Sequence, residues 1–373
     1  MKVSLVYFLH FLRHDFQCFP PSQLPLYEFH YINENKTWTE AQQYCREKHT
    51  DLVTVTNMKD MKRLINISAE DQSEAWIGLI NKPEFNRTWF WSLPGVEFDE
   101  SETNWAAGEP TDNGNQLIHE NCVHMNKNLK WTDTGCLNQH IFLCYDGENV
   151  HIFNSYFYVL KSWQKAQSYC REKHTDLISG TKQVLDGEVE KLMDQPYIGL
   201  FRDTWRWSDG SSFSFRHWNL QCNDEQYISD QCAMTKFDGE GRWTNMSCDN
   251  EKPFICYDDN VILIKENKTW EDALYYCRDH HHDLVTITNM DDQRWIQEKV
   301  KEASTDYVWM GLSYACTLDL WFWVSDEVVR YKTWASNPPM DDCDMSGAME
   351  TGGEHQWFKR NDAEKFNFIC SKK

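Results

Sequence analysis

Apolar and polar positions follow one pattern that occurs three times along the chain. Each occurrence begins with an apolar stretch of strand length, which reads YEFHYI from Tyr27, YFYVL from Tyr156 and VILI from Val261. A hydroxyl residue directly before a tryptophan then marks a helix start, because Ser and Thr side chains cap the free N–H groups of a first helical turn. These pairs are Thr37-Trp38, Ser162-Trp163 and Thr269-Trp270. The pattern therefore predicts a strand followed by a helix at three places.

The first of these helices has a clear apolar face. Trp38, Ala41 and Cys45 fall at positions i, i+3 and i+7, a spacing that puts them on one side of a helix. The stretch YCREKHTDL at the helix end is identical at 44–52 and 169–177, and YCRDHHHDL at 276–284 is a near copy. We interpret this repeat as scaffolding whose charges face water and whose histidines carry no chemistry.

Further motifs keep the same order in each repeat. A second helix is predicted after Asn57 and after Asn289, and a short apolar strand begins at Trp76, Tyr197 and Trp309. A W-x-W motif follows, and each repeat ends in an aromatic residue shortly before a cysteine, in FLCYD, FICYD and FIC. Such loop-rich units are typical of α+β domains held by disulfides. Only 13 residues separate Cys256 from Thr269, so we expect neighbouring domains to abut.

Composition indicates the compartment and excludes some partners. The formal net charge of the 373 residues is −21, which argues against nucleic acid and against anionic membranes, since both require a basic protein face. The 14 cysteines form no CxxC pair, so they favour disulfides in an oxidising, extracellular setting. Five N-x-S/T sequons, which are candidate glycosylation sites, point the same way: Asn35, Asn66, Asn86, Asn245 and Asn267.

Residues 1–24 are expected to be an N-terminal segment of the degenerate signal-peptide type. They have a basic start and an apolar run interrupted by His10, but no A-x-A-like cleavage site follows. The alternative is a truncated or misassigned first exon. No segment reaches the roughly 18–20 apolar residues of a membrane span, so we expect a secreted or extracellular protein with no transmembrane segment in this chain.

No group of residues in the sequence is typical of an enzyme. His119 and His124 flank HENCVH at i, i+5, whereas a zinc-protease helix needs i, i+4. The run of histidines at 280–282 continues a predicted helix end and is interpreted as solvated. GxSxG, P-loop and dinucleotide motifs do not occur. We therefore expect a binding protein.

Taken together, the ordered motifs resemble the C-type lectin-like domain family. The motifs are the capped tryptophan helix with Cys45, WIGL, W-x-W, ENCV, WTDTGC and FLC. The resemblance implies an α+β fold of three tandem domains, each with two helices, two small antiparallel sheets and a long loop region stapled by disulfides. It implies boundaries of 25–146, 150–258 and 259–373 for the first, second and third copies.

The resemblance also implies a set of disulfides. These are Cys45–Cys144 and Cys122–Cys136 in the first copy, Cys170–Cys256 and Cys232–Cys248 in the second, and Cys277–Cys370 in the third. Cys316–Cys343 is a candidate non-standard bridge. Cys18 and Cys222 stay unassigned.

Lectins of this family hold calcium with hard oxygen ligands, which calcium requires, in E-P-N or Q-P-D, a Glu before Cys, and W-N-D. The first copy reads GEPTDNGNQLIHENCV and KWTDTGC, so the resemblance implies a Ca2+ site there and in no other copy. Its expected metal ligands are Glu109, Glu120 and Asp133. Thr111 and Thr132 replace the usual asparagines, which predicts weak binding; the alternative is a decayed site on a stable fold. The expected ligand-binding residues are Glu109, Thr111, Asp112, Glu120, Thr132 and Asp133.

The other two copies lack most of this pattern. The second keeps only Asp230 and Asn245, and the third has Pro338-Pro339 without W-N-D. Two hypotheses follow. The first copy binds glycans weakly through calcium, or all three copies bind extracellular or cell-surface proteins without calcium.

Overall fold

The computed structural model describes residues 25–67, 74–82, 84–93, 96–113, 119–146, 149–152, 160–180, 195–211, 213–219, 231–237, 240–325, 329–335 and 343–372, with backbone alone at 149–152.

The third copy folds from one continuous stretch of chain. Within 260–372, here called the C-terminal lobe, the sheet order is β15-β21-β17-β19-β20, with β16 on β21 and β18 on β17. Its elements are β15 (Val261–Lys268), α5 (Trp270–His280), β16 (Asp283–Leu284), α6 (Met290–Val300), β17 (Tyr307–Ala315), β18 (Leu320–Trp323), β19 (Met345–Glu350), β20 (Trp357–Asn361) and β21 (Phe366–Ser371).

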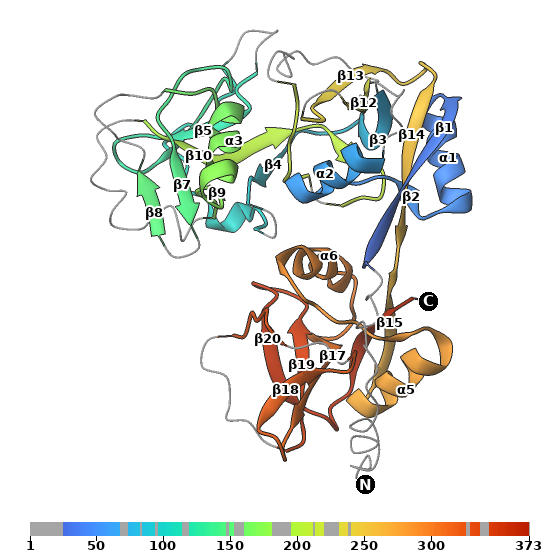
Figure 1. The fold of residues 1–373 in the computed structure, drawn as a ribbon. Coiled ribbons are helices and arrows are strands. Elements are labelled where there is room, and N and C mark those ends of the chain that lie inside the picture. The colour runs from blue at the N-terminus through green and yellow to red at the C-terminus, as the bar shows by residue number, and fades with distance from the viewer. Residues whose placement is uncertain are drawn as a thin grey trace.

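The same strand order recurs in a lobe built from two different copies. We call it the composite lobe, and it comprises the described parts of 25–82 and 205–259. Its sheet runs β1-β14-β3-β12-β13, with β2 on β14 and β11 on β3. The first copy supplies β1 (Tyr27–Lys36), α1 (Trp38–Lys48), β2 (Asp51–Leu52), α2 (Met58–Ile67) and β3 (Glu74–Asn81), and the second supplies β11 (Arg206–Trp207), β12 (Gln231–Lys236), β13 (Trp243–Ser247) and β14 (Lys252–Asp259). Blue and yellow segments accordingly share one lobe in Figure 1.

The remaining halves of the first two copies form the middle lobe, residues 84–203. One sheet has the order β4-β10-β5-β6 and another β8-β7-β9, and a bridge between Phe142 and Tyr197 connects them. The elements are β4 (Thr88–Trp91), a 3-10 turn (Glu100–Glu102), β5 (Cys122–Met125), β6 (Trp131–Thr134), β7 (Leu143–Asp146), β8 (Asn149–Ile152), α3 (Trp163–Lys173), β9 (Asp176–Leu177) and β10 (Tyr197–Asp203). The chain therefore crosses between the composite and middle lobes twice, after β3 and after β10.

Two predicted disulfides are wrong because of this exchange. The observed bonds are Cys45–Cys256 and Cys144–Cys170, not Cys45–Cys144 and Cys170–Cys256. The physical reason is that helix and last strand carry nearly the same residues in both copies, so either helix is complementary to either strand. The repeat therefore defines which motifs pair but not which copy supplies each partner.

The other predicted bridges are present. Cys122–Cys136, Cys232–Cys248 and Cys277–Cys370 form as expected, and the candidate bridge Cys316–Cys343 is confirmed. Cys18 and Cys222 lie outside the described residues, as do the 1–24 segment and the predicted strand at Tyr156.

Each repeated helix packs as its sequence predicts, and Thr37 and Thr269 cap their helices as expected, whereas the Ser162 side chain makes no capping hydrogen bond. Thr37 accepts from the Glu40 N–H while the Glu40 carboxylate accepts from the Thr37 N–H, a capping box that satisfies two otherwise free donors. Trp38, Ala41 and Cys45 are the buried residues of α1. The indoles of Trp38, Trp163 and Trp270 each donate to a carbonyl of the W/Y-x-G-L strand, to Ile77, Ile198 and Met310 at 2.8 Å in every case. These bonds fix each helix against its sheet, so the tryptophans are core residues.

The composite and C-terminal lobes abut, as the short connection predicts. β14 ends at Asp259 and β15 begins at Val261. Tyr27 stacks on Trp295 of α6 with ring centroids 4.3 Å apart, and Lys299 lies 2.6 Å from a carboxylate oxygen of Asp259. No helix in the described parts of the chain is long and apolar enough to span a bilayer.

Candidate functional site

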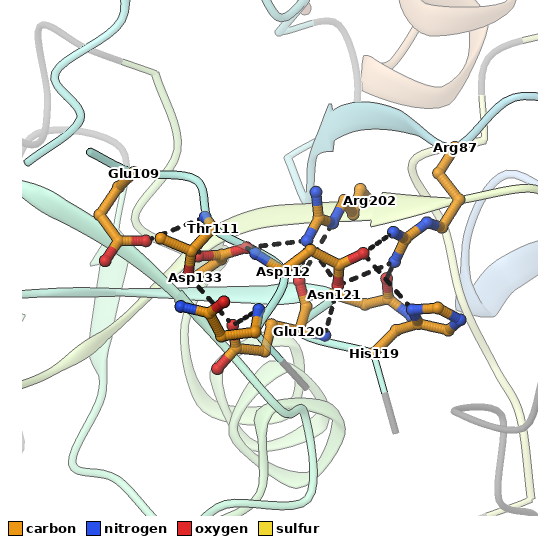
Figure 2. Close-up of polar contacts among 10 residues, drawn as sticks. Arg87, Glu109, Thr111, Asp112, His119, Glu120, Asn121, Asp133 and Arg202 are labelled. Carbon is orange, nitrogen blue, oxygen red and sulfur yellow. Dashed lines mark hydrogen bonds and ion pairs between the residues drawn. The ribbon is translucent and has the colours of Figure 1, made fainter. Parts of the chain in front are cut away.

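The residues predicted to bind ligand, apart from Thr132, meet at the β5–β6 hairpin of the middle lobe (Figure 2). Glu120 lies two residues before the start of β5, and Asp133 lies on β6 opposite Val123. The loop that carries Glu109 folds back over this hairpin, and its Glu109-Pro110 peptide bond is cis. Sequence reasoning therefore assembled the right segments.

Asp133 is the centre of the cluster and is buried. Its Oδ1 accepts a hydrogen bond from the Thr111 N–H at 3.0 Å, and its Oδ2 accepts from the Asp112 N–H at 3.0 Å. Oδ2 also accepts from Nη2 of Arg202 at 2.7 Å. Both carboxylate oxygens are thus engaged by protein donors, and the negative charge of Asp133 is balanced by a guanidinium.

Arg202 reaches this cluster from β10, a strand of the second copy. Its Nε and Nη2 donate to the carbonyl of Glu120 at 3.0 and 2.8 Å, and Nη2 lies 3.0 Å from Oδ1 of Asp112. The guanidinium also packs 4.7 Å from the ring centroid of Trp89, a cation–π contact. Burial lowers the pKa of Arg202, yet an arginine starts so high that it stays charged.

A second arginine neutralises Asp112. Arg87 contacts Oδ2 of Asp112 through Nη2 and donates from Nη1 to the side-chain oxygen of Asn121 at 2.8 Å. Burial raises the pKa of Asp112, but the hydrogen bond from Arg87 and the charges of Arg202 and Arg87 outweigh it and hold the pKa below its ordinary value. His119 lies 3.4 Å from the same carboxylate.

Glu109 and Glu120 keep more solvent contact than Asp133. Oε2 of Glu109 accepts from the Thr111 N–H at 3.2 Å, and Oε2 of Glu120 accepts from the Asn113 N–H at 2.8 Å. Burial, followed by the neighbouring Asp133 carboxyl, raises the pKa of Glu109. The carboxylates repel one another, as expected where several negative groups share a site.

Thr132 differs from the other predicted ligand residues. It lies between Trp131 and Asp133 on β6, and neighbouring residues on a strand point to opposite faces. It pairs with His124 across the hairpin. Among the described residues, no hydrogen bond connects the Thr132 side chain with the Asp133 cluster.

The residues present do not fit a calcium ion in this arrangement. Calcium takes about six to eight oxygen ligands, whereas Asp133 directs both oxygens at N–H donors and Asp112 contacts two arginines. An ion bound by Oδ2 of Asp133 would have to displace the Arg202 guanidinium, and Oδ1 already accepts the Thr111 N–H. Among the described residues, the carboxylates of this cluster do not bring three ligand atoms within 4.8 Å, while His30, His49 and Asp258 do.

Arg87 and Arg202 were not identified as site residues from the sequence, although the sequence context of each is distinctive. Arg87 is the middle residue of the Asn86 sequon, and Arg202 stands in YIGLFRD where the first copy reads WIGLINK. A charged residue replacing Asn81 in a buried strand needs a partner of opposite charge. The sequence alone could not indicate that this partner belongs to another copy.

The expected sites in the other copies are only partly described. Asp230 and Pro338-Pro339 lie outside the described residues. Asn245 is exposed on β13, and the other four sequon asparagines are exposed as well. Glycosylation at these positions stays a prediction that the exposure supports.

Comparison with known proteins identifies the kind of domain. The family model described as Lectin C-type domain matches residues 34–146, 159–258 and 266–372. Human C-type mannose receptor 2 is 23% identical over 376 residues, covering 84% of this chain and 24% of the receptor. Human secretory phospholipase A2 receptor is 23% identical over 252 residues, covering 57% and 17%. The chain thus spans about a quarter or less of the length of these curated relatives.

Among solved structures, human lithostathine matches with 24% identity and a TM-score of 0.29. The match covers 30% of this chain and 82% of lithostathine.

Proposed function

Because the chain belongs to the C-type lectin domain family, with three matches that cover most of it, we propose that it is an extracellular binding protein whose first-copy site acts without calcium. Members of this family are typically non-enzymatic binding proteins. The observation that carries the proposal is the 2.7 Å ion pair between Arg202 and Asp133. A protein cation already supplies the charge that calcium would supply at this carboxylate.

The competing hypothesis is weak calcium-dependent glycan binding through Glu109, Glu120 and Asp133. It is supported by the meeting of all three carboxylates at one hairpin. It is disfavoured because Asp133, the only one of the three that is fully buried, already accepts hydrogen bonds at both oxygens and pairs with Arg202. Calcium binding would require the energetic cost of separating a buried ion pair, which is substantial.

The preferred ligand is a protein with a basic surface. Glu109 and Glu120 are partly exposed at the site, and the chain carries a net charge of −21. Complementary charge accelerates association and suppresses wrong partners. An acidic, calcium-free site therefore favours a cationic protein over a neutral sugar.

Thermal unfolding with and without calcium tests the proposal directly. A ligand that binds only the native state raises the melting temperature, so the proposal expects equal Tm values in millimolar CaCl2 and in EDTA. A control series with MgCl2 measures the nonspecific effect of divalent salt. A saturable, calcium-specific rise in Tm that Asp133→Asn abolishes would contradict the proposal and favour the glycan hypothesis.

The extracellular setting has its own test. The structure contains six disulfides within the described residues, and disulfides persist in oxidising compartments. Expression of the chain behind a standard secretion signal in animal cells should give disulfide-bonded, glycosylated protein in the medium. Removal of N-glycans by an endoglycosidase should then increase its gel mobility. Retention in cells as reduced, unglycosylated protein would contradict the assignment.

A further inference from the structure

Two histidines and one aspartate converge on the surface of the composite lobe, far from the Asp133 cluster in sequence. Nε2 of His30 lies 2.8 Å from Oδ2 of Asp258, and Nδ1 of His49 lies 3.1 Å from Oδ1 of the same carboxylate. The two imidazole rings are stacked with centroids 4.5 Å apart. Among the described residues, this is the one group of three metal-ligating side chains whose ligand atoms all lie within 4.8 Å.

Rigid elements hold the three side chains in place. His30 is on β1 directly opposite Cys256 of β14, and His49 is the C-cap of α1, where its N–H donates to the Cys45 carbonyl at 2.7 Å. The Cys45–Cys256 disulfide joins that helix to that strand. A site built on a helix end and two paired strands is well organised before any ligand arrives.

One nitrogen of the group is buried without a well-aligned hydrogen bond. Nε2 of His30 lies 2.8 Å from the Asp258 carboxylate, but the two do not meet in hydrogen-bond geometry. Buried polar atoms are nearly always satisfied, so such an exception calls for an explanation. A bound ion that accepts the lone pair of this nitrogen would provide one.

We propose that His30, His49 and Asp258 bind a divalent transition-metal ion of the zinc class. Neutral imidazole nitrogens suit zinc, copper and nickel, whereas calcium prefers oxygen ligands alone. Zinc bonds of about 2 Å in a tetrahedral site place ligand atoms roughly 3.3 Å apart, close to the His–Asp separations present. Three protein ligands leave a fourth position for water or for a ligand atom of a bound partner.

The repeats provide an internal comparison that separates this site from scaffolding. In the middle lobe, β8 places His151 opposite Cys144 as β1 places His30 opposite Cys256. His174 lies 3.7 Å from Asp146, two residues after Cys144. The middle lobe thus carries the same three residue types at the same register positions.

The C-terminal lobe folds in the same way without this set. Ile262 stands opposite Cys370, and Lys372 follows Cys370 by two residues, so only His281 matches the group. The helix cap is nevertheless the same, because the His281 N–H donates to the Cys277 carbonyl at 2.7 Å. The fold therefore does not require His30 and Asp258, and their presence points to a bound ion.

Zinc titration of the full-length protein, freed of metal with EDTA and followed by calorimetry, tests the proposal. The decisive variant is His30→Ile, because the C-terminal lobe shows that isoleucine fits this position. We expect this variant and Asp258→Asn to lose one zinc equivalent or to bind it at least tenfold more weakly. The matched control is His281→Gln, which removes the corresponding histidine of the C-terminal lobe and should bind zinc as the parent does.

The melting temperature provides an independent readout. Zinc should raise the Tm of the parent and of His281→Gln, and the rise should be smaller for His30→Ile at equal zinc concentration. Cobalt in place of zinc should give a tetrahedral absorption spectrum that weakens in the same variant. Identical zinc stoichiometry and affinity in the parent, His30→Ile and Asp258→Asn would overturn the proposal and leave a plain histidine–aspartate ion pair.

Discussion

The guanidinium of Arg202 lies 2.7 Å from Oδ2 of Asp133, although Arg202 belongs to the second copy of the repeat and Asp133 to the first. The pair exists because β10 of the second copy occupies the place beside β5 and β6 of the first. One contact thus connects the exchange of halves with the neutralised charge of Asp133.

Replacing Arg202 by Met should destabilise the protein strongly. The substitution leaves the Asp133 charge buried without its partner, and breaking such a pair costs about 3–5 kcal/mol. Urea unfolding of the parent and Arg202→Met measures this difference. Lys265→Met is the control, because the exposed Lys265–Glu302 pair should contribute less than about 1 kcal/mol. Equal losses in the free energy of unfolding would show that the Arg202–Asp133 pair contributes no more to stability than an exposed ion pair.

Restoring the two family asparagines should not be sufficient to create a calcium site. Thr111→Asn with Thr132→Asn leaves Arg202 on Asp133, so calorimetry should detect no calcium binding. Adding Arg202→Asn removes the cation, and the corresponding residue of the WIGL strand, Asn81, shows that asparagine fits there. We expect calcium binding in the millimolar range or tighter in the triple variant alone. Binding by the double variant would mean that Arg202 does not block the ion.

Proteolysis can reveal which copy supplies each half-cystine. A specific protease site placed between residues 153 and 159 separates Cys45 and Cys144 from Cys170 and Cys256. With the observed bonds, the two fragments stay linked on a non-reducing gel. Cys18→Ser and Cys222→Ser should be present so that these two residues cannot form the link.

A second cut provides the control for that experiment. A protease site after Asn260 lies between two disulfide-closed regions, so cleavage should release the C-terminal lobe without reductant. If the fragments also separated after the first cut, the disulfides would instead be Cys45–Cys144 and Cys170–Cys256.

His217 should make stability fall as the pH decreases from neutral. Burial lowers its pKa from 6.5 to about 4, so the folded state holds the neutral ring, whose Nε2 donates to the Glu240 carbonyl at 2.8 Å. Below pH 6.5, His217 becomes protonated in the unfolded state but stays neutral in the folded state until the pH approaches 4. The loss should approach about 3 kcal/mol near pH 4 and should be absent above pH 6.5.

The measurement compares urea unfolding at pH 7.5 and pH 5 for the parent and His217→Gln. The variant should be less pH-dependent over this interval, because glutamine does not titrate. The exposed His282→Gln serves as the control and should keep the parental pH dependence. An unchanged slope in His217→Gln would show that the buried ring is not the group responsible.

The sequence predicts local structure well here because local patterns have local causes. The Thr37 cap and the Trp38, Ala41, Cys45 face predict α1 almost to its ends, since capping and a buried stripe depend on neighbours in sequence. The prediction of Cys316–Cys343 also held, because few cysteines remained once the family pairs were assigned. The order of the motifs also grouped Glu109, Glu120 and Asp133, which the fold brings together at the β5–β6 hairpin.

The partners across the repeat could not be predicted. YCREKHTDL is the same in both copies, so no residue in it prefers Cys144 over Cys256. The same ambiguity concealed Arg202, whose place beside Asp133 depends on which W/Y-I-G-L strand enters the sheet. No chemistry was assigned to His49 from the sequence. His30 and Asp258 lie far from it in sequence and meet it only in the fold.

The Cys45–Cys256 bond has a mechanical consequence. It joins residues 211 positions apart, and all of the middle lobe lies inside the covalent loop that it closes. Tension applied to the two ends of the chain would therefore pass through this bond and bypass the middle lobe, including the Arg202–Asp133 site. Under load, that lobe would keep its fold. The Cys277–Cys370 bond would shield most of the C-terminal lobe in the same way, so the force would act on the short segments outside both loops.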